Sequence, residues 1–334
     1  MKRHKVYIGA ILIALAALAV ALFNNEGRPV NRTYYRNEGK VFGTYYNVRY
    51  DAERDLSEAI DSAFAAFDRS LSMFNPESVI SAVNQNRDTV TDERFEQMWA
   101  QAMQVSEWSN GAFDITVAPL VNLWGFGFKH REEVTQEKID SIMPLIGWQK
   151  VKLEGKKVVK EDARIMLDAS AVAKGQACDV IAEVLRQHGA ENWLVDIGGE
   201  VVAHGISDKG EAWRIGITKP VDDPMGTENE LQDIIEVTDI AMATSGNYRN
   251  FYYEGKERRS HTIDPRTGRP VQHSLLSATV VAESCMKADA LATACMVLGA
   301  EDAMGLIEKA GAACYLIVSE NDSLAVRKSK NWKW

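Results

Sequence analysis

Apolar side chains recur at helical spacing in several stretches of the chain. In residues 54–74, Leu56, Ile60, Phe67 and Leu71 fall on one face of a helix, and an Asn-Pro pair ends the run. Further helices are predicted at residues 92–109, 135–145, 172–189, 285–298 and 301–310.

Stretches rich in Val, Ile, Tyr and Thr predict β-strands between these helices. One covers residues 40–51, and two more flank the Gly198-Gly199 turn. The other predicted strands are at residues 149–153, 157–160, 164–168, 212–218, 233–246 and 275–284, with a final hairpin around 320–323. Residues 111–127 are expected to form a loop. Elements interleaved in this way predict an α+β fold of largely antiparallel sheets with helices packed against them.

The N-terminal pattern differs from the rest of the chain. A basic start, MKRHK, precedes 18 residues without a charge, Val6–Phe23. A membrane-spanning helix needs about 20 apolar residues and can be as short as ~17. Ala19-Val20-Ala21 would suit a signal peptidase, so a cleaved signal peptide is the alternative. We expect an uncleaved inner-membrane anchor, with the basic end in the cytoplasm and the rest of the chain on the periplasmic side.

The expected organisation is therefore an anchor or signal segment at residues 1–23, a polar linker at 24–38 and a globular domain at 39–334. The chain of 334 residues is 46% apolar and 25% charged, which is ordinary for a globular protein. Its formal net charge of −9 argues against nucleic-acid binding, which requires a basic face. The motifs of zinc fingers, P-loops and serine-hydrolase elbows are absent from the sequence.

The four cysteines are Cys178, Cys285, Cys295 and Cys314. Each lies among apolar residues, and no Cys-x-x-Cys motif is present. We therefore expect buried free thiols, because a buried cysteine behaves as a small hydrophobic residue. One disulfide is the alternative outside the cytosol.

Asp289 and Thr293 are polar residues within the otherwise largely apolar predicted helix at 285–298. They are four residues apart and share one helix face that is otherwise Ala and Leu. A carboxylate and a hydroxyl in an apolar setting need a partner, and such oxygen ligands suit Mg²⁺ or Ca²⁺. The alternative is a buried aspartate hydrogen-bonded to a neighbouring loop.

The segment LDASAVAKGQACD places Asp168 at the end of an apolar strand and Lys174 at a helix start. Free N–H groups and the positive dipole end at such a start favour an anion, and Lys174 adds a charge. A helix merely capped by Ser170 is the alternative. The glycines do not match the dinucleotide-binding fingerprint.

The segment SHTIDPRTGRPV surrounds a rigid turn with ionisable groups. Pro265 fixes its own φ, and Gly268 permits a backbone conformation that other residues resist. His261 and Asp264 precede the turn, with arginines at positions 266 and 269. Taken by itself, His261 is most simply a structural histidine.

Taken in order along the chain, these segments resemble the ApbE family of FAD:protein FMN transferases over residues 39–328. The resemblance rests on FGTYYNV, SMFNPESVISAVN, GAFDITVAPLVNLWGFG, LDASAVAKGQACD, DIGGEVVAHG, WRIGI, ATSGNYRNFY, SHTIDPRTGRPV and ADALATACMVLG. It implies an ApbE-like, T-fold-related domain at 39–334 that uses FAD and Mg²⁺. Such enzymes attach FMN through a phosphoester bond to a threonine of an acceptor protein and release AMP. The implied acceptors are flavoprotein subunits of membrane redox complexes that carry a Ser/Thr-Gly-Ala-Thr-like motif.

The resemblance also assigns roles to residues of this chain. It implies that His261 is the catalytic base that accepts the threonine proton, which the ordinary pKa of histidine, about 6.5, would suit. The implied FAD-contacting residues are Phe42, Phe74, Ala112, Phe113, Asp114, Asp168, Lys174 and Ile263. The implied metal ligands are the side chains of Asp289 and Thr293 and the carbonyls of Ala171 and Ala292. The family's Gly-Gly-Asp is Gly198-Gly199-Glu200 here.

Three other functions compete with this one. An FAD pyrophosphatase would use the same site with water as the acceptor and would release FMN and AMP. A non-catalytic flavin-binding protein of the cell envelope would need neither a metal nor a base. A thiol oxidoreductase is disfavoured by the apolar surroundings of the cysteines.

Overall fold

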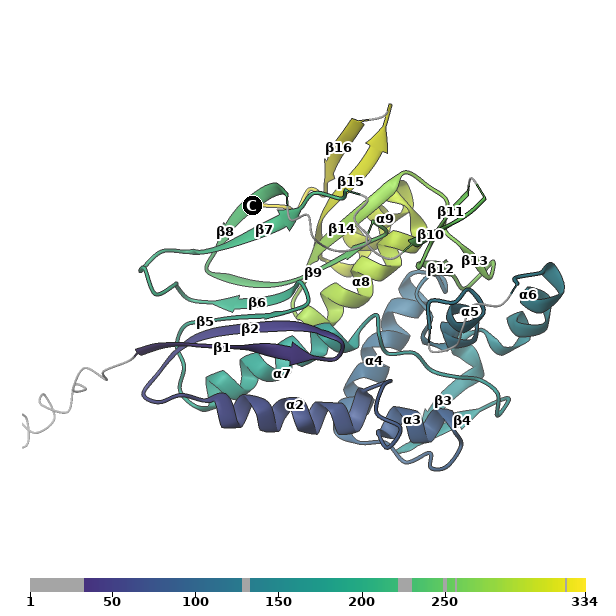
Figure 1. Cartoon of the computed structure of the whole chain (residues 1–334), viewed down its shortest axis with the longest axis horizontal. Coiled ribbons are helices and arrows are strands. Elements are labelled where there is room, and N and C mark those ends of the chain that lie inside the picture. The colour runs from purple at the N-terminus through teal and green to yellow at the C-terminus, as the bar shows by residue number, and fades with distance from the viewer. Residues whose placement is uncertain (1–32, 128–132, 222–229, 249–250, 256, 322) are drawn as a thin grey trace, which may run out of the picture.

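The protein is described by a computed structural model over residues 33–127, 133–221, 230–248, 251–255, 257–321 and 323–334. Its centre is an eight-stranded sheet in which every neighbouring pair is antiparallel (Figure 1). In order across the sheet, the strands are β1 (Thr33–Val41), β2 (Thr44–Ala52), β5 (Trp193–Ile197), β6 (Glu200–His204), β9 (Asp239–Gly246), β14 (Leu275–Val281), β15 (Ala313–Glu320) and β16 (Ser323–Lys328). The expected α+β fold with largely antiparallel pairing is confirmed.

Helices cover one face of this sheet (Figure 1). The longer ones are α2 (Ser57–Leu71), α4 (Glu93–Trp108), α7 (Ala173–Gln187), α8 (Cys285–Leu298) and α9 (Ala300–Ala310). The shorter ones are α3 (Val79–Asn84), α5 (Ala118–Leu123), α6 (Gln136–Ile142) and the 3₁₀ turns η1 (Ile115–Val117), η2 (Met143–Leu145) and η3 (Trp148–Lys150). α7 packs on β5 and β6, whereas α8 packs on β9 and β14.

The helices α4 and α8 begin within one residue of their predicted starts, and a polar side chain caps each of them. Asp92 accepts the N–H of Phe95 at 2.9 Å at the start of α4. Ser284 accepts the N–H of Lys287 at 3.2 Å at the start of α8. α8 is mostly apolar around its circumference because α4, α7, α9 and the sheet pack against it.

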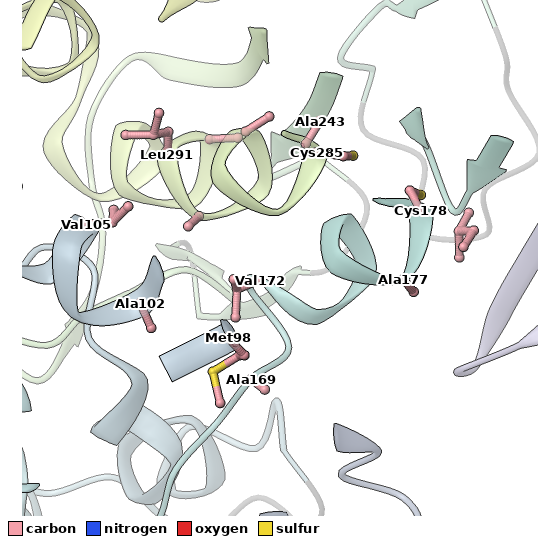
Figure 2. Close-up of a cluster of buried hydrophobic side chains, with 14 of the residues drawn as sticks. Met98, Ala102, Val105, Ala169, Val172, Ala177, Cys178, Ala243, Cys285 and Leu291 are labelled. Atoms are coloured by element: carbon pink, nitrogen blue, oxygen red, sulfur yellow. The ribbon is translucent and has the colours of Figure 1, made fainter. Parts of the chain in front are cut away.

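Small side chains let α7 and α8 approach closely in the core (Figure 2). Ala177 and Cys178 of α7 are buried, as are Cys285 and Leu291 of α8. All four cysteines are buried and free, as the sequence predicts. The close approach fixes the two helices relative to each other, and the start of α7 and one face of α8 line the cavity described below.

The other face of the sheet carries an antiparallel ribbon of β7 (Trp213–Thr218) and β8 (Leu231–Val237). Trp213 and Ile215 pack there with Val201, Met242 and Tyr315 in a second apolar cluster. Between the ribbon and the ends of the central strands lies part of the wall of the cavity.

Some sequence-based assignments are wrong. Residues 33–38, assigned to the linker, belong to β1, which pairs along its whole length with β2. Residues 164–168 are not a strand of any sheet, because Leu167 bonds through its N–H and carbonyl to the side chain of Asn84, at 2.7 and 2.8 Å. The expected loop at 111–127 contains η1 and α5.

Small hairpins complete the described chain. Two of them, β10 (Phe251–Glu254) with β11 (Glu257–Ser260) and β12 (Ile263–Asp264) with β13 (Arg269–Pro270), flank His261, and the sequence did not predict them. The third, β3 (Val151–Glu154) with β4 (Lys157–Lys160), is close to its predicted position.

The predicted membrane anchor at residues 1–23 and the start of the linker lie outside the described residues. Within the described ranges, no helix combines the length and the apolar character that a membrane span requires. The anchor therefore stays a prediction.

Candidate active site

A large cavity brings together residues from distant parts of the chain. Its volume is about 970 Å³, which is at the upper end for a small-molecule site. Its wall is formed by η1, the β5–β6 turn, the ribbon, the start of α7, the end of β9 and one face of α8. The predicted site residues that line it are Phe74, Ala112, Phe113, Asp114, Asp168, Ala171, Lys174, His261, Ile263, Asp289 and Thr293.

Phe42 and Ala292 are the predicted site residues outside this lining. Phe42 is at the tip of the β1–β2 hairpin, with a φ of 50°. Its ring packs against Phe64 and Phe67 of α2, with centroids 6.0 and 5.2 Å away. Ala292 is fully buried within α8. Their contacts with FAD and with a metal stay predictions.

Asp114 fixes the turn that carries Ala112 and Phe113 into the cavity wall. Its Oδ1 accepts hydrogen bonds from the N–H and the hydroxyl of Thr116, at 2.8 and 2.7 Å. Its Oδ2 accepts the N–H of Trp148 at 2.8 Å. Burial raises the pKa of Asp114 above its ordinary value, although these bonds oppose the rise. Asp114 thus caps η1 and ties it to a segment that comes much later in the chain.

Asp168 stabilises the loop that leads into α7. Its N–H donates to the carbonyl of Ile115 at 2.6 Å, and its Oδ1 accepts the N–H of Ser170 at 2.8 Å. The loop therefore lies beside the Asp114 turn. The N-cap of α7 is Val172, which supplies no capping side chain, so the alternative of a helix capped by Ser170 is wrong.

Lys174 meets two carboxylates at the bottom of the cavity. Its Nζ lies 2.5 Å from Oε1 of Glu200 and 3.9 Å from Oδ1 of Asp289. The Glu200 contact is a short charge-assisted hydrogen bond, and it was not foreseen from the sequence. An acidic residue directly after a Gly-Gly turn was the available signal, but the sequence did not show that α7 passes beside it.

The three charges shift one another's pKa values. Burial lowers the pKa of Lys174, but Asp289 and Glu200 outweigh it, so the pKa is raised and the ammonium stays charged. Burial raises the pKa of both Glu200 and Asp289, while the nearby ammonium opposes the rise. The arrangement is a compact, mostly buried group of one cation and two acids.

Asp289 and Thr293 both face the cavity from α8, as their spacing predicts. Oδ2 of Asp289 accepts the N–H of Gly175 at 3.0 Å. The hydroxyl of Thr293 lies 3.3 Å from that of Ser245, a cavity residue that the sequence analysis assigned no role. These donors are oxygen atoms, and Mg²⁺ typically takes one or two carboxylates and completes its shell with water and substrate phosphates.

The donor set therefore fits a Mg²⁺ ion that is held together with a phosphate-bearing ligand. Among the described residues, there is no cluster of three or more His, Cys, Asp or Glu side chains suited to a metal.

His261 lies on the cavity wall between β11 and β12. The ring of Phe126 contacts the imidazole of His261 edge-on, with ring centroids 6.3 Å apart. Phe126 itself stacks on Tyr252, with ring centroids 5.2 Å apart. These aromatic rings restrict the orientation of the imidazole.

The turn after His261 is held by its own side chains. The N–H of Arg266 donates to Oδ1 of Asp264 at 2.9 Å, and the guanidinium binds both carboxylate oxygens at 2.9 Å. Gly268 has a φ of 71°, and its carbonyl accepts Nε1 of Trp124 at 2.8 Å. Arg269 donates to Gln136. Asp264 therefore orients the turn, and both arginines have partners within the protein. Arg249 of the motif ATSGNYRNFY lies outside the described residues.

Comparison with known proteins gives one consistent family. A model of the ApbE family matches residues 42–316. The FAD:protein FMN transferase of Vibrio cholerae is 34% identical, over 96% of this chain and 97% of that protein. That of Haemophilus influenzae is 33% identical over 98% of each chain.

Solved structures agree with this result. The flavin transferase ApbE from Vibrio cholerae matches with a TM-score of 0.80 at 34% identity, over 90% of this chain and 98% of that one. The flavinyl transferase ApbE of Pseudomonas stutzeri, in its apo form, matches with a TM-score of 0.80 at 31% identity, over 90% and 95% of the two chains.

Proposed function

The chain belongs to the ApbE family and is an FAD:protein FMN transferase, and on this premise we propose how its residues carry out the transfer. We infer a Mg²⁺-dependent reaction in which FMN passes from FAD to a threonine hydroxyl of an acceptor protein. The observation that carries this proposal is one cavity that holds oxygen donors for a metal, a cation for a diphosphate and a histidine.

The transfer exchanges a phosphoanhydride bond of FAD for a phosphoester bond to the acceptor. The threonine oxygen forms a bond to the FMN-side phosphorus of FAD, and the bond from that phosphorus to the bridging oxygen breaks. AMP leaves with the bridging oxygen. His261 accepts the proton of the hydroxyl as the oxygen attacks, a role that suits an imidazole near neutral pH.

The start of α7 is suited to hold the diphosphate. Lys174 brings its ammonium into the cavity, where 32% of its side chain is exposed. The N-terminal end of the helix adds the positive end of its dipole, which favours anions. Positioning and electrostatics of this kind supply most of the rate in phosphoryl transfer.

Asp289 and Thr293 would hold the Mg²⁺, with the carbonyls of Ala171 and Ala292 as further candidates. A Mg²⁺ ion bound there would neutralise charge on the phosphates and on the departing AMP. Gly175 keeps one oxygen of Asp289 in a hydrogen bond, which fixes the orientation of the carboxylate.

We further propose that the enzyme works at a membrane. The apolar segment Val6–Phe23 would anchor it in the inner membrane, with the cavity on the periplasmic side. Its acceptors would be flavoprotein subunits of membrane redox complexes with a Ser/Thr-Gly-Ala-Thr-like motif.

Mass spectrometry tests the proposed reaction. The purified full-length chain is incubated with FAD, Mg²⁺ and a protein domain that carries a Ser/Thr-Gly-Ala-Thr motif. We expect the acceptor to gain the mass of FMN minus water, with an equal amount of AMP released. Free FMN and AMP beside an unmodified acceptor would indicate an FAD pyrophosphatase, and intact FAD bound to the protein would leave only flavin binding.

A further inference from the structure

We propose that Glu200 is a positioning residue, which holds the ammonium of Lys174 away from Asp289 so that Asp289 stays available to a divalent metal. The inference rests on the metal-dependent function proposed above. It states that part of the protein's metal affinity depends on Glu200, a residue outside the predicted ligand set.

The distances show which acid holds the lysine. Nζ of Lys174 donates a hydrogen bond to Glu200 at 2.5 Å, whereas the nearest oxygen of Asp289 is 3.9 Å away, beyond hydrogen-bonding range. The ammonium is thus bound to Glu200 and only attracted through space by Asp289.

Without Glu200, the same lysine would become a competitor for the metal site. A mostly buried ammonium requires a close anion, and the flexible lysine stem lets it move to one. Asp289 is the other carboxylate that the structure places beside it. Because Oδ2 of Asp289 already accepts the N–H of Gly175, the ammonium would take Oδ1 and neutralise the charge that attracts a divalent ion.

Glu200 is well placed to act as a fixed anchor. It is the first residue of β6 and follows Gly198 and Gly199, whose φ values of 68° and 102° form the tight β5–β6 turn. The N–H of Gly199 donates to Oδ1 of Asp196 at 3.0 Å, which stabilises the turn. The thiol of Cys178 in α7 donates to the carbonyl of Glu200 at 3.2 Å. The backbone at Glu200 is therefore tied to the helix that carries Lys174.

The second oxygen of Glu200 points to a ligand as well. The side chain is only 3% exposed and lines the cavity, yet Oε2 has no hydrogen-bond partner among the residues that the structure describes. An unsatisfied buried carboxylate oxygen is costly, so a hydrogen-bond donor is expected there when the cavity is filled. A ligand hydroxyl or a bound water would provide one.

A double-mutant cycle on metal binding tests the inference. Mg²⁺ and Mn²⁺ are titrated without FAD, by calorimetry, into the full-length wild type and the variants Glu200→Gln, Lys174→Gln and Lys174→Gln/Glu200→Gln. We expect Glu200→Gln to weaken metal binding about tenfold. In the Lys174→Gln background the same substitution should change the affinity less than about threefold, because Glu200 acts through the lysine.

Asp196→Asn is the matched control. Asp196 is in the same hairpin and also lines the cavity, but its side chain is on the opposite face of the sheet from that of Glu200, because Ile197 is the residue that pairs with Glu200. Asn also keeps the oxygen that accepts the N–H of Gly199. The metal affinity of Asp196→Asn should stay close to that of the wild type. If loss of negative charge alone were the cause, Asp196→Asn and Glu200→Gln would both bind the metal more weakly.

The outcomes separate this inference from the function on which it rests. A wild type that binds neither Mg²⁺ nor Mn²⁺ contradicts the proposed metal site and the inference with it. If the wild type binds the metal and Glu200→Gln binds it equally well, the inference is contradicted, whereas the proposed metal site is not. Equal weakening with and without Lys174 would also overturn it, since Glu200 would then act on the metal directly. If Glu200→Gln does not fold, the comparison in the Lys174→Gln background still tests the inference, because a clear loss of metal affinity there would overturn it.

Discussion

The backbone N–H of Gly175 in α7 donates a hydrogen bond to Oδ2 of Asp289 in α8 at 3.0 Å. This bond joins the start of α7 to the cavity-lining face of α8, and it orients the predicted metal ligand. The approach requires glycine, because a Cβ at position 175 would lie 2.2 Å from the carbonyl oxygen of Cys285.

Gly175→Ala should therefore separate α7 from α8. We expect the free energy of unfolding to fall by about 3 kcal/mol, because the clash is with backbone and cannot be relieved by a side-chain rotation. Chemical denaturation measures it. Gly305→Ala is the control: it lies inside α9 with open space at its Cβ, and it should be neutral or stabilising by up to about 1 kcal/mol. Equal stability of the two variants would contradict the close contact.

Asp289→Asn should remove metal-dependent turnover while the protein stays folded. Asparagine can still accept the N–H of Gly175, but it lacks the charge that holds a divalent ion. We expect activity in a Mg²⁺ titration to fall by at least about 100-fold, since a catalytic metal supplies several kcal/mol. Glu301→Gln, an exposed acid of α9, should behave as wild type. A normal Mg²⁺ response of Asp289→Asn would refute the metal assignment.

His261→Ala should bind FAD but transfer FMN poorly. Loss of a general base costs about 10²–10⁴-fold in rate, whereas the cavity wall stays largely intact. Flavin fluorescence measures binding, and acceptor mass measures transfer. His188→Ala, an exposed histidine that follows α7, is the matched control and should transfer normally. If His261→Ala transfers at the wild-type rate, the base is another group.

Asp179 predicts a specific pH dependence of stability. Its carboxylate accepts the N–H groups of Cys285 and Met286, both at 2.9 Å, at the start of α8. Burial raises its pKa from 3.8 to about 6. Between these two pKa values, Asp179 is deprotonated in the unfolded chain but still protonated in the folded protein. Its contribution to the free energy of unfolding is therefore fully present below pH ~4 and is lost as the pH rises to ~6.

The full pKa shift of Asp179 would correspond to about 3 kcal/mol in the free energy of unfolding. Because the carboxyl is partly exposed, we expect a change of about 1 kcal/mol. Urea unfolding of the wild type and of Asp179→Asn at a series of pH values measures the difference. The wild type should lose stability relative to the variant as the pH rises from 4 to 6.5. A difference that is constant with pH would show that the carboxyl titrates normally.

Trp124→Phe should loosen the turn that follows His261. The variant loses the 2.8 Å hydrogen bond from Nε1 to the carbonyl of Gly268, and we expect a loss of about 2 kcal/mol in unfolding free energy from the unpaired buried carbonyl. Trp148→Phe is the matched control, because Nε1 of Trp148 is buried without a hydrogen-bond partner in the described structure. Differential scanning calorimetry should place the melting temperature of Trp124→Phe below that of Trp148→Phe, and the reverse order would contradict the role of this bond.

Local patterns in the sequence predicted many of the elements well. The helix at 285–298 was assigned with its actual bounds, because Ser284 caps it and Gly299 ends it. The segment 164–168 was misassigned because its run of apolar residues is typical of a buried strand. In the structure, the backbone of Leu167 bonds instead to the side chain of Asn84, which is distant in the sequence. β1 was missed because its polar residues resemble a linker until its partner β2 is known.

The sequence by itself determined the family, the long helices and part of the set of residues that line the cavity, because these depend on motifs and on local periodicity. Only the tertiary structure decided which charges meet. The contact of Lys174 with Glu200 arises where α7 passes the β5–β6 turn, and the packing of Phe42 on α2 takes it out of the cavity lining. Such contacts depend on how packed elements face one another across long sequence separations, which no local pattern records.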